Sequence, residues 1–331
     1  MQKNKHGAIW SYLPKGCELC LKGSKLVLFI TGKCNNKCYY CPISLERKNK
    51  DIVYGNEKQI KNFDDLAKEA KEMNALGVGI TGGDPFTDIS LVVKYLKFLK
   101  EKFGKDFHAH LYTYGDLVNE KNIKLLEEAG LDEIRFHSLT NIEHALKTKM
   151  DVGIEVPVIP GQKEYLKKLV DFCSKNNIFI NLNEFEFSDT NMQELEKRNF
   201  THSDYSYAVN GSKKLALEIV RYAVNKKVKV NFCSLQNKYY GQLTERNKRR
   251  ALIIKKPWQE VNEYGMMVFG AIECTKELAN KLNLDYNEKE KYAECRLKDA
   301  KILAKKYNLK AYKVILYPTY NPWVFEKDPI N

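Results

Sequence analysis

The sequence lacks any run of about 18 apolar residues, and so it lacks the segment that a membrane-spanning helix requires. Its start, MQKNKHGAIWSYLPKG, has no apolar stretch of the kind found in a secretory signal, so we expect a cytoplasmic protein that does not use a membrane. No low-complexity linker and no internal repeat beyond an alternation of strands and helices is evident. These absences leave 331 residues with 44% hydrophobic content, enough for one large domain or a domain with an extension.

Cysteine, by contrast, is present nine times, and in a reducing cytoplasm such residues more often bind metal or react than form disulfides. Three of them, Cys34, Cys38 and Cys41, fall within the stretch TGKCNNKCYYCP in the spacing C-x3-C-x2-C. A structural zinc ion takes four ligands, and a [4Fe–4S] cluster normally takes four thiolates. Three thiols on one loop would leave one iron without a protein ligand. Such an open iron is useful only if something else binds there.

The net charge of +13 has two interpretations. It favours a polyanionic partner, with nucleic acid as the first candidate. It is also typical of a genome with A/T-rich codons, because Lys, Asn, Ile, Tyr and Phe are all abundant. The stretch NKYYGQLTERNKRR combines aromatic side chains with basic ones, a combination that suits the phosphates and stacked bases of a nucleic acid. The same basic side chains could instead bind a carboxylate-bearing ligand, or lie on a solvated helix face without a ligand. Its candidate polyanion-binding residues are Lys238, Arg246, Arg249 and Arg250.

Short apolar runs alternate with amphipathic segments from Lys25 onward, which predicts parallel strands joined by helices. The expected fold class is α/β, a partial (β/α)6 barrel with functional groups at the carboxyl ends of its strands. We expect an N-terminal cysteine-containing cap over 1–24, the barrel over 25–190 and a C-terminal α/β extension over 191–331. Within the extension, periodicity predicts one long helix over 288–308. The six barrel strands are predicted at 25–31, 77–81, 107–113, 132–138, 153–160 and 178–185.

The cysteine loop, placed directly after the first strand, resembles that of the radical SAM superfamily. The resemblance implies a [4Fe–4S] cluster held by Cys34, Cys38 and Cys41, with S-adenosylmethionine (SAM) chelating the fourth iron. It also implies reductive cleavage of SAM to a 5′-deoxyadenosyl radical that abstracts a hydrogen atom. The electron would come from a donor of the ferredoxin or flavodoxin type. The aromatic residue before the third cysteine, here Tyr40, usually lies near the adenine in this family.

Further segments agree with the order of motifs in that family and give candidate SAM-binding residues. TGGDP, at the end of the second strand, resembles its Gly-Gly-Glu motif, with Asp84 in place of the glutamate. The two glycines would let the backbone approach the ligand closely. The remaining candidates follow later strands, with Val158 to Gly161 expected beneath the adenine. The full set is Tyr40, Gly82, Gly83, Asp84, Pro85, Thr113, Ser138, Val158 and Gly161.

Polar side chains near the ends of the fourth and sixth strands are candidates for the substrate cavity. They are His137, Asn181, Asn183 and Glu184. Buried polar groups need partners, so these residues either line the cavity or pair with one another inside the core.

Six cysteines remain outside the loop. Cys17 and Cys20 form a C-x2-C pair before the first strand, and Cys233 ends a predicted strand. We hypothesise that these three hold a second iron–sulfur cluster; a zinc ion, a redox pair of thiols and simple packing are the alternatives. Cys173, Cys274 and Cys295 lie in or near helical patterns and are expected in the core.

The substrate is not given by these motifs, and two classes fit. The charge and the basic aromatic stretch favour modification of RNA, in particular tRNA. The chain also resembles archaeal-type radical SAM proteins described as related to pyruvate formate-lyase activating enzyme, which implies an activase that modifies another protein. A small-molecule substrate and a cluster-binding scaffold without turnover are the remaining alternatives.

Overall fold

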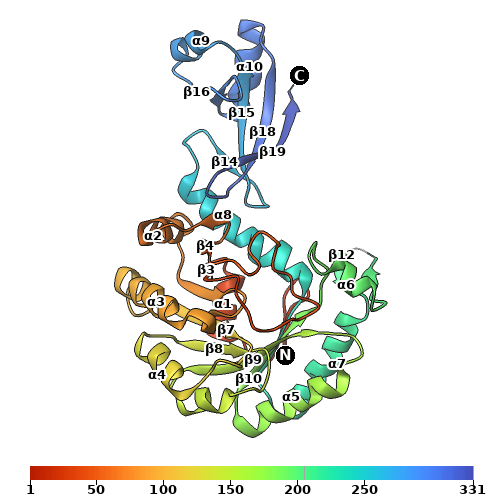
Figure 1. The fold of residues 1–331 in the computed structure, drawn as a ribbon. Coiled ribbons are helices and arrows are strands. Elements are labelled where there is room, and N and C mark those ends of the chain that lie inside the picture. Colours follow the sequence, from red (N-terminus) through yellow and green to blue (C-terminus); the bar gives the residue numbers. More distant parts are fainter. Residues whose placement is uncertain (205, 331) are drawn as a thin grey trace. The chain divides into compact units, whose positions relative to one another are not determined.

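The computed structural model describes residues 1–204 and 206–330. They form two compact units, the first made of residues 1–71 and 75–242, the second of residues 72–74 and those from 243 onward. Each unit has its own sheet (Figure 1). None of the helices in the described ranges has both the length and the apolar character needed to cross a bilayer.

The first unit is built on a curved sheet whose seven central strands run parallel. These strands, β3, β6, β7, β8, β9, β10 and β13, lie side by side in the order in which they occur along the chain. Helices α2, α3, α4, α5 and α7 lie outside the curve (Figure 1). The predicted α/β fold with a partial barrel is therefore confirmed, and the six predicted strands correspond to β3, β6, β7, β8, β9 and β10. The short strands β1 and β2 extend one edge in antiparallel fashion, and β4 and β5 extend the other.

The strands of this unit are β1 (Gln2–Lys3), β2 (Ile9–Trp10), β3 (Lys25–Phe29), β4 (Tyr54–Gly55), β5 (Lys58–Gln59), β6 (Gly77–Thr81), β7 (His108–Thr113), β8 (Glu133–Phe136), β9 (Asp151–Val158), β10 (Phe179–Glu184), β11 (His202–Ser203), β12 (Ser206–Val209) and β13 (Val230–Cys233). Its α-helices are α1 (Lys15–Leu21), α2 (Phe63–Glu72), α3 (Ile89–Phe103), α4 (Glu120–Glu128), α5 (Lys163–Asn176), α6 (Met192–Glu196) and α7 (Ser212–Asn225). Two 3₁₀-helices, η1 (Pro85–Asp88) and η2 (Ile142–Lys147), and a π-helix, η3 (Asn237–Leu243), complete it.

The compact first unit extends beyond residue 190, where we expected the barrel to end. Helix α7 packs on α5, β9 and β10, and β13 pairs in parallel with β10. All four residues of β13 are buried, so the strand adds to the barrel wall and gives the sheet a seventh parallel member. The division of the chain therefore falls after residue 242.

The interior of the barrel is polar, although the faces of its strands alternate as the sheet pattern requires. Ile80 and Leu111, which are fully buried, belong to the apolar layer of the sheet. On the inner face, Arg135 Nε donates to Glu133 Oε1 at 2.5 Å, and its Nη1 donates to Glu155 Oε2 at 2.5 Å. Glu155 also accepts hydrogen bonds from the amides of two asparagines on β10 (2.6 and 2.8 Å). A buried ion pair of this kind needs such additional partners to offset the loss of hydration.

Helix α1 lies inside the curve of the sheet (Figure 1) and is tied to this charged layer. The backbone N–H of Gly16 donates to Glu133 Oε2 at 3.0 Å. A Cβ atom at Gly16 would lie 2.6 Å from Arg135 Nη2, so only glycine lets the helix approach this closely.

The buried amine of Lys25, at the start of β3, should make the free energy of unfolding depend on pH. Its Nζ donates to His108 O at 2.8 Å, and burial lowers the pKa of this amine from 10.5 to about 7. Above the folded pKa, the unfolded chain binds one proton more than the folded chain, so stability should rise with pH by up to about 1.4 kcal/mol per unit. Urea unfolding of cluster-free protein between about pH 7 and about pH 9 should show this slope, and Lys25→Met should remove it. The exposed Lys163→Met is the control; an equal slope in all three proteins contradicts the assignment.

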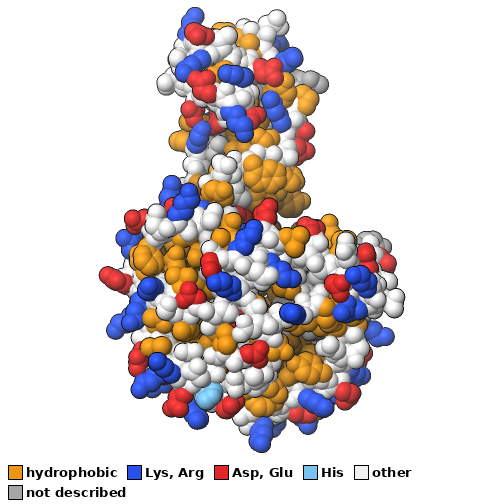
Figure 2. All heavy atoms as spheres, viewed as in Figure 1, with side chains coloured by type: hydrophobic (Ala, Val, Ile, Leu, Met, Phe, Trp, Pro, Cys, Tyr) orange, Lys and Arg blue, Asp and Glu red, His pale blue; other side chains and the backbone are white. Residues whose placement is uncertain are grey.

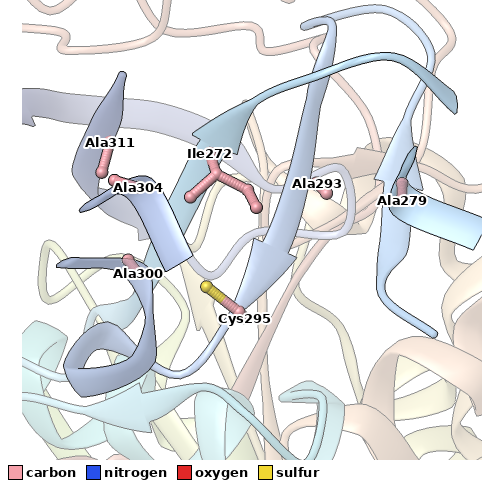
Figure 3. Close-up of a cluster of buried hydrophobic side chains, with 7 residues drawn as sticks. All are labelled: Ile272, Ala279, Ala293, Cys295, Ala300, Ala304 and Ala311. Carbon is pink, nitrogen blue, oxygen red and sulfur yellow. The ribbon is translucent and has the colours of Figure 1, made fainter. Parts of the chain in front are cut away.

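The second unit is an antiparallel sheet with helices on one face. The strand order is β16, β17, β15, β18, β19, with β14 paired to β15. One cluster of its core is made of mostly small side chains from β15, α9, β17, α10 and β18, with Cys295 among them (Figure 3). The elements are α8 (Thr244–Ile254), β14 (Glu260–Val261), β15 (Met267–Glu273), α9 (Lys276–Lys281), β16 (Asp285–Asn287), β17 (Tyr292–Cys295), α10 (Leu297–Tyr307), β18 (Ala311–Tyr317) and β19 (Trp323–Pro329).

The single helix predicted over 288–308 was wrong for its first half. Residues 292–295 form β17, which pairs with β15, and only 297–307 are helical. Tyr292 and Cys295 are buried at the two ends of this strand, and Glu294 is buried as well, with its carboxylate accepting from Trp258 Nε1 at 3.1 Å. Tertiary pairing therefore overrides the helical pattern.

Candidate functional site

A cavity of about 750 Å³ opens at the carboxyl ends of β3, β6, β7 and β8. The three clustered cysteines lie on its wall, and among the described residues no other cysteine lines it. A site at this end of the strands is where parallel α/β barrels place their functional groups. The lining residues used below are Cys34, Lys37, Cys38, Tyr40, Cys41, Lys48, Gly82, Gly83, Pro85, Tyr112, Thr113, Tyr114, His137, Thr190, Glu194 and Arg198.

The cysteine loop is pinned where it leaves β3. Gly83 N donates to Thr31 O at 2.7 Å, and Asp84 N donates to Lys33 O at 2.8 Å. A Cβ atom at Gly83 would lie 2.1 Å from Lys33 O, so this approach of two backbones requires glycine. We expected the two glycines to let the backbone approach a ligand closely. In the structure they let it approach the backbone of the cysteine loop.

Asp84, which stands where the family motif has glutamate, is turned toward its own scaffold. Its carboxylate accepts from Thr113 Oγ1 at 3.1 Å and from Tyr114 N at 3.0 Å, and it caps η1 through Phe86 N. Burial raises the pKa of this carboxyl, while these hydrogen bonds oppose the shift. Asp84 therefore joins the ends of β6 and β7 and does not itself line the cavity.

His137 lines the cavity, and one of its ring nitrogens is held by the backbone. Its Nδ1 lies 2.5 Å from the carbonyl oxygen of Glu155, which can only accept, so Nδ1 carries the proton. The other nitrogen, Nε2, is then the acceptor in the neutral ring. His137 lines the cavity, so Nε2 is the ring atom available to a ligand.

The structure divides the predicted SAM and substrate residues into two sets. The cavity brings together Tyr40, Gly82, Gly83, Pro85, Thr113 and His137 with the three cysteines. It does not include Asp84, Ser138, Val158, Gly161, Asn181, Asn183 and Glu184.

Several residues of the second set have partners of their own, which explains their absence from the wall. Ser138 Oγ donates to Tyr114 O at 2.7 Å. Glu184 accepts from Leu235 N at 2.7 Å. Asn181 and Asn183 donate to Glu155, so for these polar strand residues pairing within the core is the alternative that the structure adopts.

Sequence reasoning missed a wall made by the segment after β10. Thr190, Glu194 and Arg198 line the cavity, and Arg198 lies over the ring of Tyr39 at 4.3 Å from its centroid. It also missed Tyr112 and its neighbour Tyr114. Their position at the end of β7 was the available signal, since polar groups at strand ends face this cavity.

Cys17, Cys20 and Cys233 all lie inside the barrel unit, and Cys20 is close enough to Cys17 and to Cys233 for their charges to interact. Cys17 Sγ accepts from Asn231 Nδ2 at 3.5 Å, and Cys233 Sγ accepts from Asn237 Nδ2 at 3.5 Å. Burial raises the pKa of Cys20 to about 11, so this thiol, like those of Cys34 and Cys38, would have to release its proton to bind a metal. The second cluster stays a prediction.

The residues predicted to bind a polyanion are largely engaged within the protein. Lys238 Nζ contacts Glu186 at 2.9 Å, and Arg250 Nη2 contacts Glu72 at 2.6 Å. Arg249 donates to the carbonyl of Asn74 from α8, the helix that also carries Arg246. On the face drawn in Figure 2, Lys and Arg side chains are interspersed with Asp and Glu. Three of the four residues thus have partners within the protein, and binding of a polyanion there stays a prediction.

Comparison with known proteins identifies the family. The family model described as the radical SAM superfamily matches residues 28–140. A protein of Methanocaldococcus jannaschii is 42% identical over 289 residues, 81% of this chain and 76% of that protein; its name provisionally describes it as a glycyl-radical enzyme activating enzyme. A protein of Methanococcus maripaludis with the provisional name GTP 3′,8-cyclase is 27% identical over 182 residues, 48% of this chain and 58% of that protein. The chain belongs to the radical SAM superfamily.

Among solved structures, SuiB of Streptococcus suis aligns over 67% of this chain and 52% of its own, with 15% identity and a TM-score of 0.44. This chain thus spans about half the length of that structure, and we draw nothing further from a TM-score of this size. As a radical SAM enzyme, the protein uses a [4Fe–4S] cluster and SAM.

The donor set of the cavity fits these cofactors. Cys34, Cys38 and Cys41 lie on one wall, and thiolates are the ligands that iron–sulfur clusters take. Burial raises the pKa of Cys34 and Cys38, so cluster binding has to release protons. Within residues 1–204 and 206–330, no three His, Cys, Asp or Glu side chains are already arranged around a metal position.

Proposed function

We propose that this protein is an activating enzyme that abstracts a hydrogen atom from a glycine residue of a partner protein. The observation that carries the proposal is the 42% identity with the M. jannaschii protein, which extends over both compact units at 81% of this chain. This level of identity favours an activity shared with that relative. The names of the relatives do not suggest RNA modification, so we favour the activating enzyme over it.

The cavity supports a substrate larger than a single cofactor. Its volume of about 750 Å³ lies toward the upper end of ligand sites, which span roughly 300–1,000 Å³. SAM would occupy the part beside the cysteine loop, and an extended glycine-containing segment would enter beside the wall formed by residues 190–198. Lys37, between two of the cysteines, and Lys48 also line the cavity; both are exposed and suit an acidic electron donor of the ferredoxin or flavodoxin type.

The residues of this chain have positioning roles in the proposed reaction. When bound, the cluster and SAM supply one-electron chemistry that ends in abstraction of a hydrogen atom. Cys34, Cys38 and Cys41 hold the cluster, and the backbone at Gly82 and Gly83 leaves room for the ligand beside it. His137 Nε2 accepts a hydrogen bond from a backbone N–H of the incoming polypeptide, and Tyr112 and Tyr114 limit access of water.

The proposal is tested by electron paramagnetic resonance (EPR) on anaerobic extracts of the host strain lacking this gene. Adding reconstituted protein, SAM and dithionite should produce an organic radical with the doublet splitting of a glycyl α-hydrogen. Growth of the strain on glycine deuterated at its α-carbon should collapse that doublet. Formation of 5′-deoxyadenosine with no protein radical, together with a restored modified nucleoside in bulk tRNA, would instead show the RNA function.

A further inference from the structure

The third cysteine of the loop is held from outside the loop, by the segment that follows β10. Thr190 Oγ1 donates to Cys41 O at 3.2 Å, and Asn191 Nδ2 donates to Tyr40 O at 3.1 Å. These two carbonyls belong to the peptide groups on either side of the Cys41 α-carbon. With both peptide planes held, the direction of the Cα–Cβ bond of Cys41 is set, and the thiol is left with the few staggered positions about that bond.

Asn191 is itself held in place by its surroundings. It is only 1% exposed, and Nδ2 also donates to Glu186 O at 3.2 Å. Its Oδ1 accepts from Ser188 N at 2.7 Å. A buried amide with this set of hydrogen bonds is held in one orientation. Asn191 can therefore hold the cysteine loop in a fixed position relative to the barrel.

Aromatic contacts join the same two segments. The ring of Tyr40 meets that of Phe185 edge-on, with centroids 6.0 Å apart, and Arg198 lies over the ring of Tyr39. Tyr39 and Tyr40 thereby pack against the buried cluster formed by Phe185, Phe187, Leu195 and Val209 with Ile159. The segment from 185 to 200 thus contacts each of the three residues from Tyr39 to Cys41.

The first cysteine of the loop, Cys34, has a different kind of contact. Cys34 Sγ accepts from Asn36 N at 3.4 Å, a contact within the loop itself. The loop has other outside hydrogen bonds, from Asp84 N to Lys33 O and from Asn36 Nδ2 to Asp116 Oδ2 (2.9 Å). The bonds from Thr190 and Asn191 are the ones that reach the peptide groups flanking Cys41.

We propose that Asn191 and Thr190 are positioning residues that fix Cys41 as a cluster ligand. Groups that orient metal ligands from outside the first coordination sphere typically change metal affinity 10- to 100-fold when removed. Thr190 also lines the cavity, together with Glu194 and Arg198 from the same segment. One element therefore sets both the place of the third cysteine and the shape of the cavity wall, for whichever substrate the enzyme takes.

Two variants separate this role from a purely structural one. Asn191→Asp keeps the acceptor for Ser188 N and the size of the side chain, but it cannot donate to Tyr40 O. Thr190→Val keeps the shape of its side chain and removes the hydroxyl, whereas Thr190→Ser keeps the hydroxyl. Gln193→Ala is the matched control, because Gln193 is exposed on the same short helix, α6.

The measurements are the rate at which a chelator removes iron from the reconstituted protein and the EPR spectrum of the reduced cluster with SAM. Hydrogen exchange of the peptide containing Cys41, measured on cluster-free protein, gives a readout that needs no cofactor. Asn191→Asp and Thr190→Val should lose iron about tenfold to hundredfold faster, change the EPR spectrum and exchange faster at Cys41. Thr190→Ser and Gln193→Ala should resemble the unaltered protein.

Thermal unfolding of the cluster-free variants shows whether the fold is intact. If Asn191→Asp lowers the unfolding temperature by itself, Thr190→Val carries the test, because the Thr190 side chain is partly exposed and its hydroxyl contacts Cys41 O and the Ser188 hydroxyl. Iron loss, spectrum and exchange that match the unaltered protein in Thr190→Val overturn the proposal. So does a Thr190→Ser variant that behaves as Thr190→Val does.

Discussion

Replacing Cys34, Cys38 and Cys41 together by alanine should abolish formation of 5′-deoxyadenosine from SAM, down to the level seen without enzyme. The three thiols lie on the wall of one cavity at the carboxyl ends of the barrel strands. An iron–sulfur cluster depends on its thiolate ligands, and SAM cleavage in this superfamily depends on the cluster. The measurement is product formation under dithionite, together with iron and sulfide per chain.

The matched control is Cys274→Ser, which alters a partly buried thiol of the second unit. This variant should keep both iron and SAM cleavage. The triple variant also tests the second cluster. Residual iron without SAM cleavage would support Cys17, Cys20 and Cys233 as ligands, and complete loss of iron would remove that hypothesis. Residual SAM cleavage would contradict the assignment of the cavity itself.

The barrel strands were predictable because their sequence pattern and their environment agree. Strands such as β3 and β6 are buried along most of their length, and that environment favours the short apolar runs on which the prediction rests. The cysteine loop was predictable for a similar reason. Its spacing is local, so no knowledge of distant contacts is needed to place Cys34, Cys38 and Cys41 on one turn.

What could not be predicted depends on partners far apart in the sequence. The stretch 288–308 has helical spacing throughout, yet β17 forms there because it pairs with β15, a strand that lies earlier in the sequence beyond α9 and β16. Asn181 and Asn183 both donate to the carboxylate of Glu155, so their side chains lie in the core and do not line the cavity. Lys238 had a basic, aromatic neighbourhood in the sequence, but Glu186 lies beside it in space. Single-sequence patterns carry no record of such pairs.

The buried ion pairs of the barrel interior lead to the largest expected effect on stability. Arg135 joins Glu133 and Glu155, and the side chains of Arg135 and Glu133 are 2% and 0% exposed. Arg135→Met should lower the free energy of unfolding by about 3–5 kcal/mol, because it leaves two buried carboxylates without their cation. Urea unfolding of the cluster-free protein measures this change. The exposed Lys163→Met, which breaks a surface ion pair with Glu218, should leave the midpoint unchanged.

The pH dependence of this deficit identifies its cause. Burial alone would raise the pKa of Glu155, but the charge of Arg135 and the amides of Asn181 and Asn183 hold it below its usual value. In the unaltered protein this stabilisation is present above the unfolded pKa and is lost as the pH falls. Without Arg135 the sign reverses: burial dominates, the folded pKa rises, and stability falls as the pH rises through the unfolded value. The deficit of Arg135→Met should therefore be larger near neutral pH than near about pH 5.

A third variant distinguishes charge from packing. Combining Glu133→Gln and Glu155→Gln with Arg135→Met removes the unpaired carboxylates while it keeps similar volumes, and a large part of the lost stability should return. If the deficit comes from packing of the guanidinium in the barrel, the combined variant will be no more stable than Arg135→Met at any pH. That result, or a deficit for Arg135→Met below about 1 kcal/mol, would contradict the view that this charged layer holds helix α1 and the parallel strands in place.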